Sequence, residues 1–77
     1  MDGRLKALLA DTLQIPEARV AEDLAMKDVE TWDSLRHMEL IAAIEKAYAL
    51  DLTFEEIVSM QTVDQIRRVL SLRGVSA

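Results

Sequence analysis

The chain of 77 residues contains no cysteine, only one proline and only two glycines. Without cysteine, disulfides and thiolate metal sites are excluded, so apolar packing has to hold the core together. The scarcity of helix-breaking residues favours helices over a sheet, which would need many turns. A chain this short folds as a single domain, which we place at residues 1–77.

Positive charge is also scarce, because nine Lys and Arg residues stand against 14 Asp and Glu residues and give a net charge of −5. This balance argues against binding to nucleic acids or anionic membrane surfaces, since both need clustered basic side chains. No apolar run approaches the roughly 20 residues of a membrane span, and the first residues lack the pattern of a signal peptide. We expect a monomeric, cytoplasmic protein that meets basic patches on its partners.

The spacing of apolar residues predicts an all-α fold, a small four-helix bundle of three longer helices and one short third helix. The first helix covers about residues 2–13, and the strongest covers about residues 34–49, with Asp33 as its N-cap. A long, acid-rich loop over residues 16–32 joins these two helices, with a short helical turn expected near residues 21–25. Loops of this length are uncommon in compact domains and are often functional.

Two capping boxes predict the remaining helices. Thr53 with Glu56 opens the short third helix, about residues 54–59. Thr62 with Gln65 opens the last helix, which runs to about residue 72 and is followed by Gly74 as its stop.

A catalytic site is hard to assemble from this sequence. The one histidine, His37, lies three residues after Ser34 on the strongest helix. A serine hydrolase needs a nucleophile, a base and a group that orients the base, and the sequence offers no third member. We therefore favour a surface position for His37, with a small hydrolase as the alternative. The acidic residues lack the alternating spacing of a calcium loop, so we expect no metal site and no enzyme.

The segment Trp32-Asp33-Ser34-Leu35 lies where the acidic loop meets the strongest helix. Ser34 is expected to be exposed at the start of that helix. A phosphate joined to its hydroxyl would face free backbone N–H groups and the positive end of the helix dipole. The alternative is that Asp33 and Ser34 only cap the helix.

At this segment the sequence resembles the acyl carrier protein family, and the resemblance covers nearly the whole chain. It rests on Asp33-Ser34-Leu35, Met38-Glu39-Leu40-Ile41, Ala43-Ile44-Glu45 and Met60-Gln61-Thr62-Val63-Asp64-Gln65-Ile66. The resemblance implies that Ser34 carries 4′-phosphopantetheine. A holo-acyl-carrier-protein synthase, a phosphopantetheinyl transferase that recognises Asp33 and Leu35, would transfer it from coenzyme A. The thiol of the arm would then hold acyl groups as thioesters for acyl-loading and acyl-processing enzymes.

Two positions depart from the pattern of the family. Thr31 stands where many members have glycine, and Arg36 stands where fatty-acid carriers often have an acidic residue. The Trp32-Asp33-Ser34-Leu35 segment looks like that of stand-alone carriers of specialised pathways. Peptidyl carriers usually have a Gly-Gly pair before the serine, which this chain lacks, so an acyl cargo is preferred over an aminoacyl one. Fatty-acid, polyketide and specialised lipid or polysaccharide pathways stay open, as does an unmodified helical interaction module.

The resemblance also implies that partner enzymes dock on the second helix. Leu35 and Met38 would supply apolar contacts, while Glu39, Glu45 and Arg36 would supply charged ones. Taken one at a time, each charged side chain could equally belong to an ordinary solvated helix face, and Met38 could belong to the core.

Several apolar residues could line a space for an acyl chain, but we expect them to fill the core instead. They are Leu40, Ile41, Ile44, Ile57, Met60 and Ile66. Tyr48 and Phe54 are expected in the core or at its edge, and Trp32 is expected to act as a structural lid over the loop.

Overall fold

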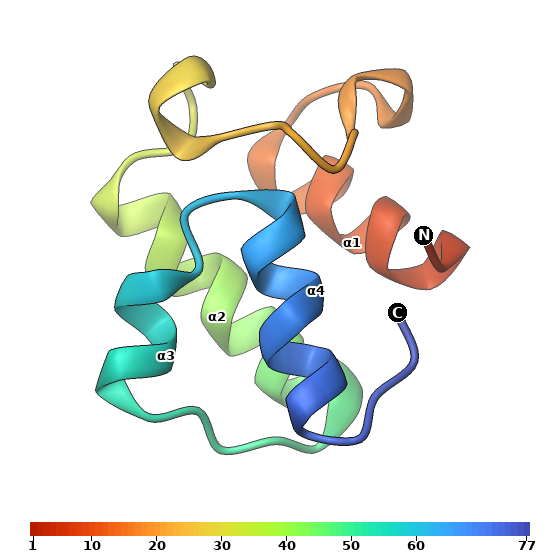
Figure 1. Cartoon of the computed structure of the whole chain (residues 1–77). Coiled ribbons are helices and arrows are strands. Elements are labelled where there is room, and N and C mark those ends of the chain that lie inside the picture. The colour runs from red at the N-terminus through yellow and green to blue at the C-terminus, as the bar shows by residue number, and fades with distance from the viewer.

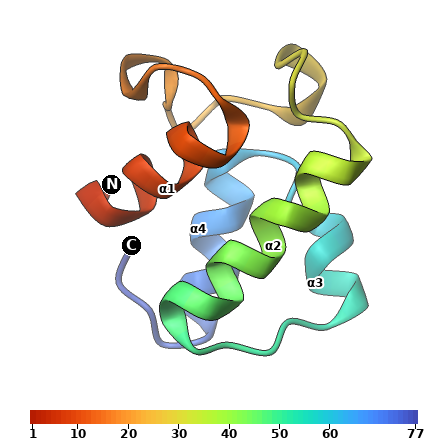
Figure 2. The same cartoon turned by 180° about the vertical axis from the view of Figure 1, so that it is seen from behind.

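The computed structural model describes all residues, 1–77, and confirms the predicted all-α bundle (Figure 1). The helices are α1 (Gly3–Leu13), α2 (Ser34–Tyr48), α3 (Phe54–Ser59) and α4 (Val63–Leu72). Helices α1, α2 and α4 surround the core, and the short α3 lies beside α2 in both views (Figures 1 and 2). None of the helices has both the length and the apolar character that crossing a lipid bilayer would require.

One continuous hydrophobic core holds the helices together. Its fully buried members come from all three longer helices and from the residue that follows α3, and they are Leu5, Leu9, Leu13, Leu40, Ile44, Met60, Val63, Ile66 and Leu70. Tyr48 packs against this core and is partly buried, as expected for a residue at the core edge.

The start of each helix is fixed by a side-chain cap. The Asp33 carboxylate accepts a hydrogen bond from Arg36 N–H at 2.8 Å, which confirms the predicted N-cap of α2. Thr53 and Glu56 form the reciprocal capping box that was predicted for α3. The prediction for α4 was wrong in part: the Thr62 hydroxyl accepts from the backbone of Gln65, but the Gln65 side chain makes no return bond, so Thr62 is a simple N-cap.

Residues in the left-handed backbone region mark the ends of α1, α2 and α4. Gly74 has φ +81°, and Val75 N–H donates to the carbonyl of Leu70 at 2.8 Å, which closes a Schellman motif and confirms the predicted end of α4. At the end of α2 the corresponding residue is Ala49, with φ 55°. Its Cβ crowds the backbone in this conformation, whereas glycine would have no Cβ to crowd.

Replacing Ala49 with glycine is therefore expected to stabilise the protein by about 0.5–1 kcal/mol. The matched control is Ala42→Gly, on the exposed face of α2, which is expected to destabilise the protein by about 1 kcal/mol because glycine is a poor helix former. Urea unfolding followed by circular dichroism measures both changes. A loss of stability in Ala49→Gly would contradict the expectation.

The loop between α1 and α2 is tied down by backbone hydrogen bonds as well as by apolar side chains. It contains two short 3₁₀ turns, Glu17–Arg19 and Met26–Asp28. The helical turn predicted near residues 21–25 was wrong, because this segment forms a tight turn closed by Leu24 N–H and the Ala21 carbonyl. The buried Val20 and Val29 and the partly buried Leu24 and Met26 anchor the loop to the core.

Further backbone bonds join this loop to the segment between α3 and α4 and to the start of α4. Met26 N–H donates to the Gln61 carbonyl at 2.8 Å, and Val63 N–H donates to the Leu24 carbonyl at 2.9 Å. Thr31 also donates its hydroxyl hydrogen to the Leu13 carbonyl at 2.5 Å. The chain just before α2 is therefore held in place on two sides, which fixes the position of the residues that begin α2.

An ion pair links α3 to the end of α4. Arg73 donates to the Glu56 carboxylate from Nε at 2.9 Å and from Nη2 at 2.5 Å, and Nη2 also donates to the Asp51 carbonyl. These bonds from Arg73, with the backbone bond from Thr53, lower the pKa of Glu56 from its ordinary value of 4.5 to about 2. The charged form of Glu56 is therefore favoured by the fold.

Because the pKa of Glu56 is lowered on folding, its contribution to stability is fully present above about pH 4.5 and is lost as the pH falls towards 2. Glu56→Gln keeps an oxygen that can accept from Thr53 N–H but removes the charge. We expect the difference in urea midpoint between pH 6 and pH 3 to be smaller in this variant than in the unaltered protein. Equal differences in the two proteins would show that the Glu56–Arg73 ion pair does not contribute to stability.

Candidate functional site

Ser34 is the first residue of α2 and lies at the point where the long loop meets the helix. Its side chain is exposed, and its hydroxyl makes no hydrogen bond within the protein. The Asp33 side chain and carbonyl accept the N–H groups of Arg36 and His37, while the N–H groups of Ser34 and Leu35 have no partner. A reachable hydroxyl thus lies beside two free donors at the positive end of a helix of 15 residues.

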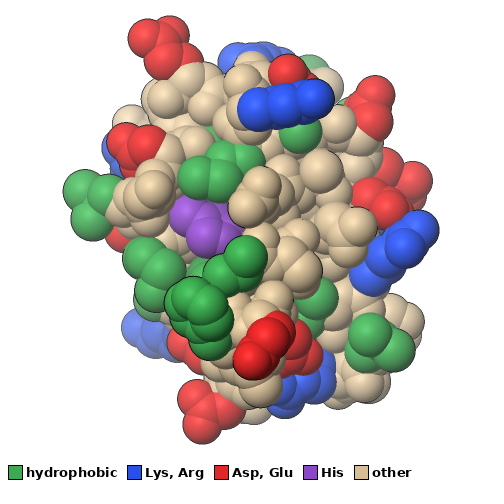
Figure 3. Space-filling view, turned by 60° about the vertical axis from the view of Figure 1, so that its left-hand side comes forward, with side chains coloured by type: hydrophobic (Ala, Val, Ile, Leu, Met, Phe, Trp, Pro, Cys, Tyr) green, Lys and Arg blue, Asp and Glu red, His purple; other side chains and the backbone are tan.

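A mostly apolar cleft of about 260 Å³ opens beside Ser34, between α2 and α3. Five of its eight lining residues are hydrophobic. The lining residues are Met26, Ser34, His37, Met38, Phe54, Ile57, Val58 and Gln61. Figure 3 shows this face, where apolar side chains gather around the one histidine of the chain. The free hydroxyl and the apolar surface are therefore parts of the same site.

His37 forms the floor of this cleft and joins three segments of the chain. It is only 8% exposed, so the predicted surface position was wrong. Its Nδ1 accepts a hydrogen bond from Trp32 Nε1–H at 3.0 Å, and its Nε2 lies 2.9 Å from the Ile57 carbonyl oxygen on α3. Helical spacing could have indicated this burial, since His37 precedes the buried Leu40 and Ile41 by three and four residues.

The same bonds argue against a hydrolase that uses Ser34 and His37. The indole N–H of Trp32 can only donate, so Nδ1 of His37 has to be unprotonated. The Ile57 carbonyl can only accept, so Nε2 carries the proton, and the ring is neutral with both nitrogens occupied. No ring nitrogen is left to take a proton from Ser34. The chain also has no group of three or more His, Asp or Glu side chains arranged to hold a metal ion.

Trp32 has the structural role that the sequence predicted. It is 2% exposed, and its ring stacks on that of His37 with the centroids 6.1 Å apart. The bond between the two rings was not predicted, because nothing in the local pattern says that an indole and an imidazole five residues apart meet across the start of a helix.

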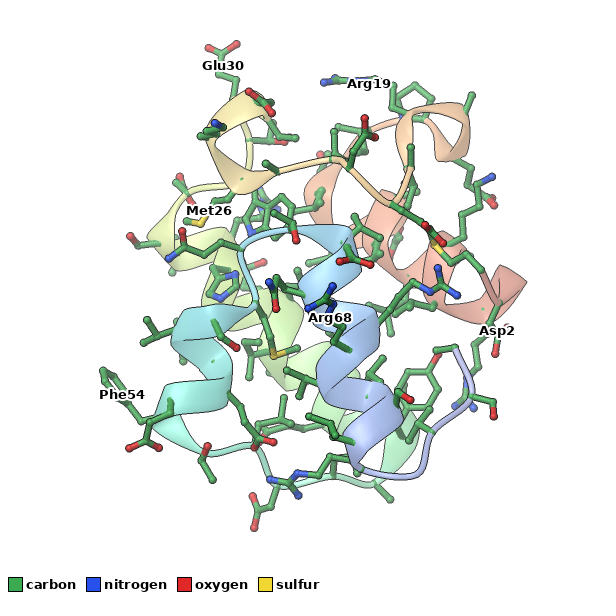
Figure 4. All side chains as sticks on the ribbon, viewed as in Figure 1. Asp2, Arg19, Met26, Glu30, Phe54 and Arg68 are labelled. Atoms are coloured by element: carbon green, nitrogen blue, oxygen red, sulfur yellow. The ribbon has the colours of Figure 1, made fainter.

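Three exposed apolar side chains line the mouth of the cleft, and they are Met38, Phe54 and Val58. Leu35, the residue after Ser34, is also exposed but does not line the cleft. The expectation that Phe54 lies in the core or at its edge was wrong, because the side chain is 77% exposed. Figure 4 shows Phe54 projecting away from the start of α3. As the first residue after the Thr53 cap, Phe54 lies on the outer side of a helix that is only six residues long.

The charged residues proposed for docking differ in their exposure and in whether their side chains already bond to other groups of the protein. Arg36 and Glu39 are partly exposed neighbours on α2, with Nη1 and Oε2 3.7 Å apart. An exposed pair of this kind contributes little to stability, typically 0–1 kcal/mol. Glu45 is partly buried, and its carboxylate accepts a hydrogen bond from Leu52 N–H at 2.9 Å. Glu45 thus holds the segment that follows α2, a role that the sequence analysis missed.

The residues considered as a lining for an acyl chain divide into two groups. Five of them are buried in the core, namely Leu40, Ile41, Ile44, Met60 and Ile66. Only Ile57 is partly exposed and lines the cleft beside Ser34.

Comparison with known proteins places this site in a family. Residues 3–70 match the family model described as "Phosphopantetheine attachment site". An acyl carrier protein of Thermosynechococcus vestitus is 35% identical over 69 residues, which cover 82% of this chain and 78% of that protein. Polyketide-8 synthase acyl carrier protein 1 of Streptomyces avermitilis is 30% identical over 67 residues, which cover 87% of this chain and 80% of that protein. An acyl carrier protein of Petrotoga mobilis is 29% identical over 68 residues, which cover 88% of this chain and 80% of that protein.

The matched residues include α1, α2, α3, most of α4, the long loop and the exposed serine at the start of α2. A family model that spans nearly the whole chain, together with these relatives, shows that the protein belongs to the acyl carrier protein family, whose phosphopantetheine attachment domain carries covalently attached 4′-phosphopantetheine.

Proposed function

We propose that Ser34 is the residue that carries 4′-phosphopantetheine, joined through a phosphodiester to its hydroxyl oxygen. The observation that supports this most directly is the free, exposed hydroxyl at the mouth of an apolar cleft. Proteins of this family are carriers rather than enzymes. The thiol at the end of the arm would hold acyl groups as thioesters and raise their effective concentration at a docked enzyme.

The residues around Ser34 fit an attached phosphodiester. The unpartnered N–H groups of Ser34 and Leu35 lie at the positive end of the α2 dipole, where a negative group is stabilised by about 0.3–1 kcal/mol. Asp33 caps the helix through its carboxylate, so it keeps these two donors in position while the hydroxyl of Ser34 stays free. The apolar lining of the cleft lies next to the attachment point and suits the carbon chain of a prosthetic arm.

The family implies that a phosphopantetheinyl transferase and acyl-processing enzymes are its partners. We propose that they dock on the exposed side of α2, where Leu35 and Met38 offer apolar surface and Arg36 and Glu39 offer charge. Glu45 would assist by fixing the end of α2 rather than by direct contact, because its carboxylate is already bonded to Leu52 N–H.

For the cargo, we propose an acyl or small hydroxyacyl group rather than an aminoacyl group. The relatives include two proteins named acyl carrier protein and one acyl carrier protein of a polyketide synthase. The last of these names supports a polyketide pathway, and a fatty-acid pathway is a second option. A specialised lipid or polysaccharide pathway stays a third option. We also propose that the protein is a monomer in the cytoplasm, with the apolar rim of the cleft reserved for partners.

The test is to incubate the protein with coenzyme A and a promiscuous phosphopantetheinyl transferase and to measure its intact mass. We expect one phosphopantetheine group to be added per chain. Digestion and fragmentation of the product should place the addition on Ser34. An unchanged mass would contradict the proposal and would favour an unmodified interaction module.

The docking proposal predicts that Leu35→Ala slows modification by the transferase about 5- to 30-fold in kcat/KM, the range expected for loss of a well-packed apolar contact. The matched control is Leu72→Ala. Leu72 is 85% exposed, against 72% for Leu35, but it lies at the end of α4, away from the proposed face. Initial rates read by mass spectrometry compare the two variants. Equal rates for both would show that Leu35 makes no such contact.

A further inference from the structure

We propose that His37 is a specificity-determining residue that keeps short acyl chains out of the helical core. By fastening α2 to α3 across the floor of the Ser34 cleft, it sets the chain length at which a cargo can begin to enter between the helices. This inference rests on the proposed attachment of the prosthetic arm at Ser34.

The floor of the cleft is polar, although the cleft itself and the core behind it are apolar. His37 Nε2–H on α2 donates a hydrogen bond of 2.9 Å to the Ile57 carbonyl oxygen on α3. This bond links the two helices. The other side of the ring is held by Trp32 Nε1–H at 3.0 Å and by stacking on the indole. One turn further along α2 the core begins, with Leu40 fully buried and Ile41 almost so.

A chain that leaves the cleft for the core has to part His37 from Ile57. The indole is almost completely buried, and a chain that fills the cleft excludes water from the His37 ring, so neither group gains a water molecule in exchange. Leaving such buried groups without partners shifts the equilibrium for entry of the acyl chain into the core by roughly 5- to 150-fold against entry. Each buried methylene favours entry by only about fourfold. The penalty is therefore equivalent to about one to four methylenes of cargo.

The chain offers a way to remove this polar floor while keeping the fold. Replacing both members of a buried hydrogen-bonded pair with apolar groups of similar shape can be nearly neutral for stability. In the double variant Trp32→Phe/His37→Leu, neither an indole N–H nor an imidazole nitrogen is left buried without a partner. The Ile57 carbonyl still accepts from Met60 N–H. The matched control is His37→Gln, which keeps one donor and one acceptor.

The test loads acetyl-, butanoyl-, hexanoyl- and octanoyl-phosphopantetheine onto the protein from the acyl-coenzyme A by a promiscuous transferase. Intact mass shows whether loading occurs. The NMR signals of labelled methionine methyl groups then report on two positions. Met38 lies at the mouth of the cleft, and Met60, after α3, is fully buried. Any cargo on Ser34 should shift Met38, whereas only a chain that enters the core should shift Met60.

We expect Met60 to begin to shift at a chain length at least two carbons shorter in the double variant than in the unaltered protein. His37→Gln should behave like the unaltered protein. If all three proteins are loaded and Met60 begins to shift at the same chain length in each, the inference is overturned and the proposed function stays intact. A Met60 shift with acetyl or butanoyl cargo in the unaltered protein would also overturn it, even if the double variant did not fold. No mass increase with any acyl-coenzyme A would overturn the proposed function, and this inference with it.

Discussion

Ser34→Ala is expected to gain no mass on incubation with coenzyme A and a phosphopantetheinyl transferase, whereas the unaltered protein gains one phosphopantetheine group per chain. The reason is chemical, because alanine has no hydroxyl to form the phosphodiester. The fold should survive the change. The helix cap belongs to Asp33, the Ser34 hydroxyl makes no hydrogen bond, and alanine favours a helix more than serine does.

A matched serine separates loss of the site from loss of the fold. Ser71 is exposed near the end of α4 and makes no side-chain hydrogen bond, so Ser71→Ala should be modified at the rate of the unaltered protein. The urea midpoints of both variants should lie close to that of the unaltered protein, with stability changes within about 0.5 kcal/mol. Modification of Ser34→Ala at any other hydroxyl would place the attachment site elsewhere in the chain.

Much of the fold could be predicted because it depends on residues that are close together in the sequence. Asp33 and Thr53 each cap a backbone N–H three residues away, so the residue type and the spacing are sufficient to place the start of a helix. The same applies to Gly74, whose positive φ closes the last helix. Ser34 could be placed at a helix start for this reason, and its exposure follows from that position.

The parts that could not be predicted depend on contacts between distant residues. His37 is bonded to Ile57, 20 positions away, and this bond fixes both the burial of the ring and its tautomer. Glu45 is bonded to the backbone of Leu52, which it reaches only because Ala49 turns the chain at the end of α2. In both cases the side chain looked free for an outward role until the partner segment was in place. Local patterns therefore placed Ser34, the proposed attachment point, at an exposed helix start, but they missed the side-chain bonds that support this region.

The second large effect is expected at the floor of the cleft. His37→Leu should lower the free energy of unfolding by about 1–3 kcal/mol, because the indole N–H of the buried Trp32 loses its acceptor and the bond to Ile57 is lost. A core in a domain of this size supplies only about 3–5 kcal/mol of net stability. The single change should therefore bring the protein close to the limit of stable folding. Urea unfolding followed by circular dichroism measures the loss.

The double-mutant cycle tests whether this loss comes from the Trp32–His37 bond. Trp32→Phe alone leaves Nδ1 of His37 without a donor and also removes indole volume, so it should be destabilising as well. In Trp32→Phe/His37→Leu neither group remains unpaired, and the two losses should fall short of additivity by about 1 kcal/mol or more. Circular dichroism is the appropriate probe, because the double variant has no tryptophan. Losses that add to within about 0.5 kcal/mol would mean that the two rings are only neighbours in the core, and that the bond between them does not stabilise the fold.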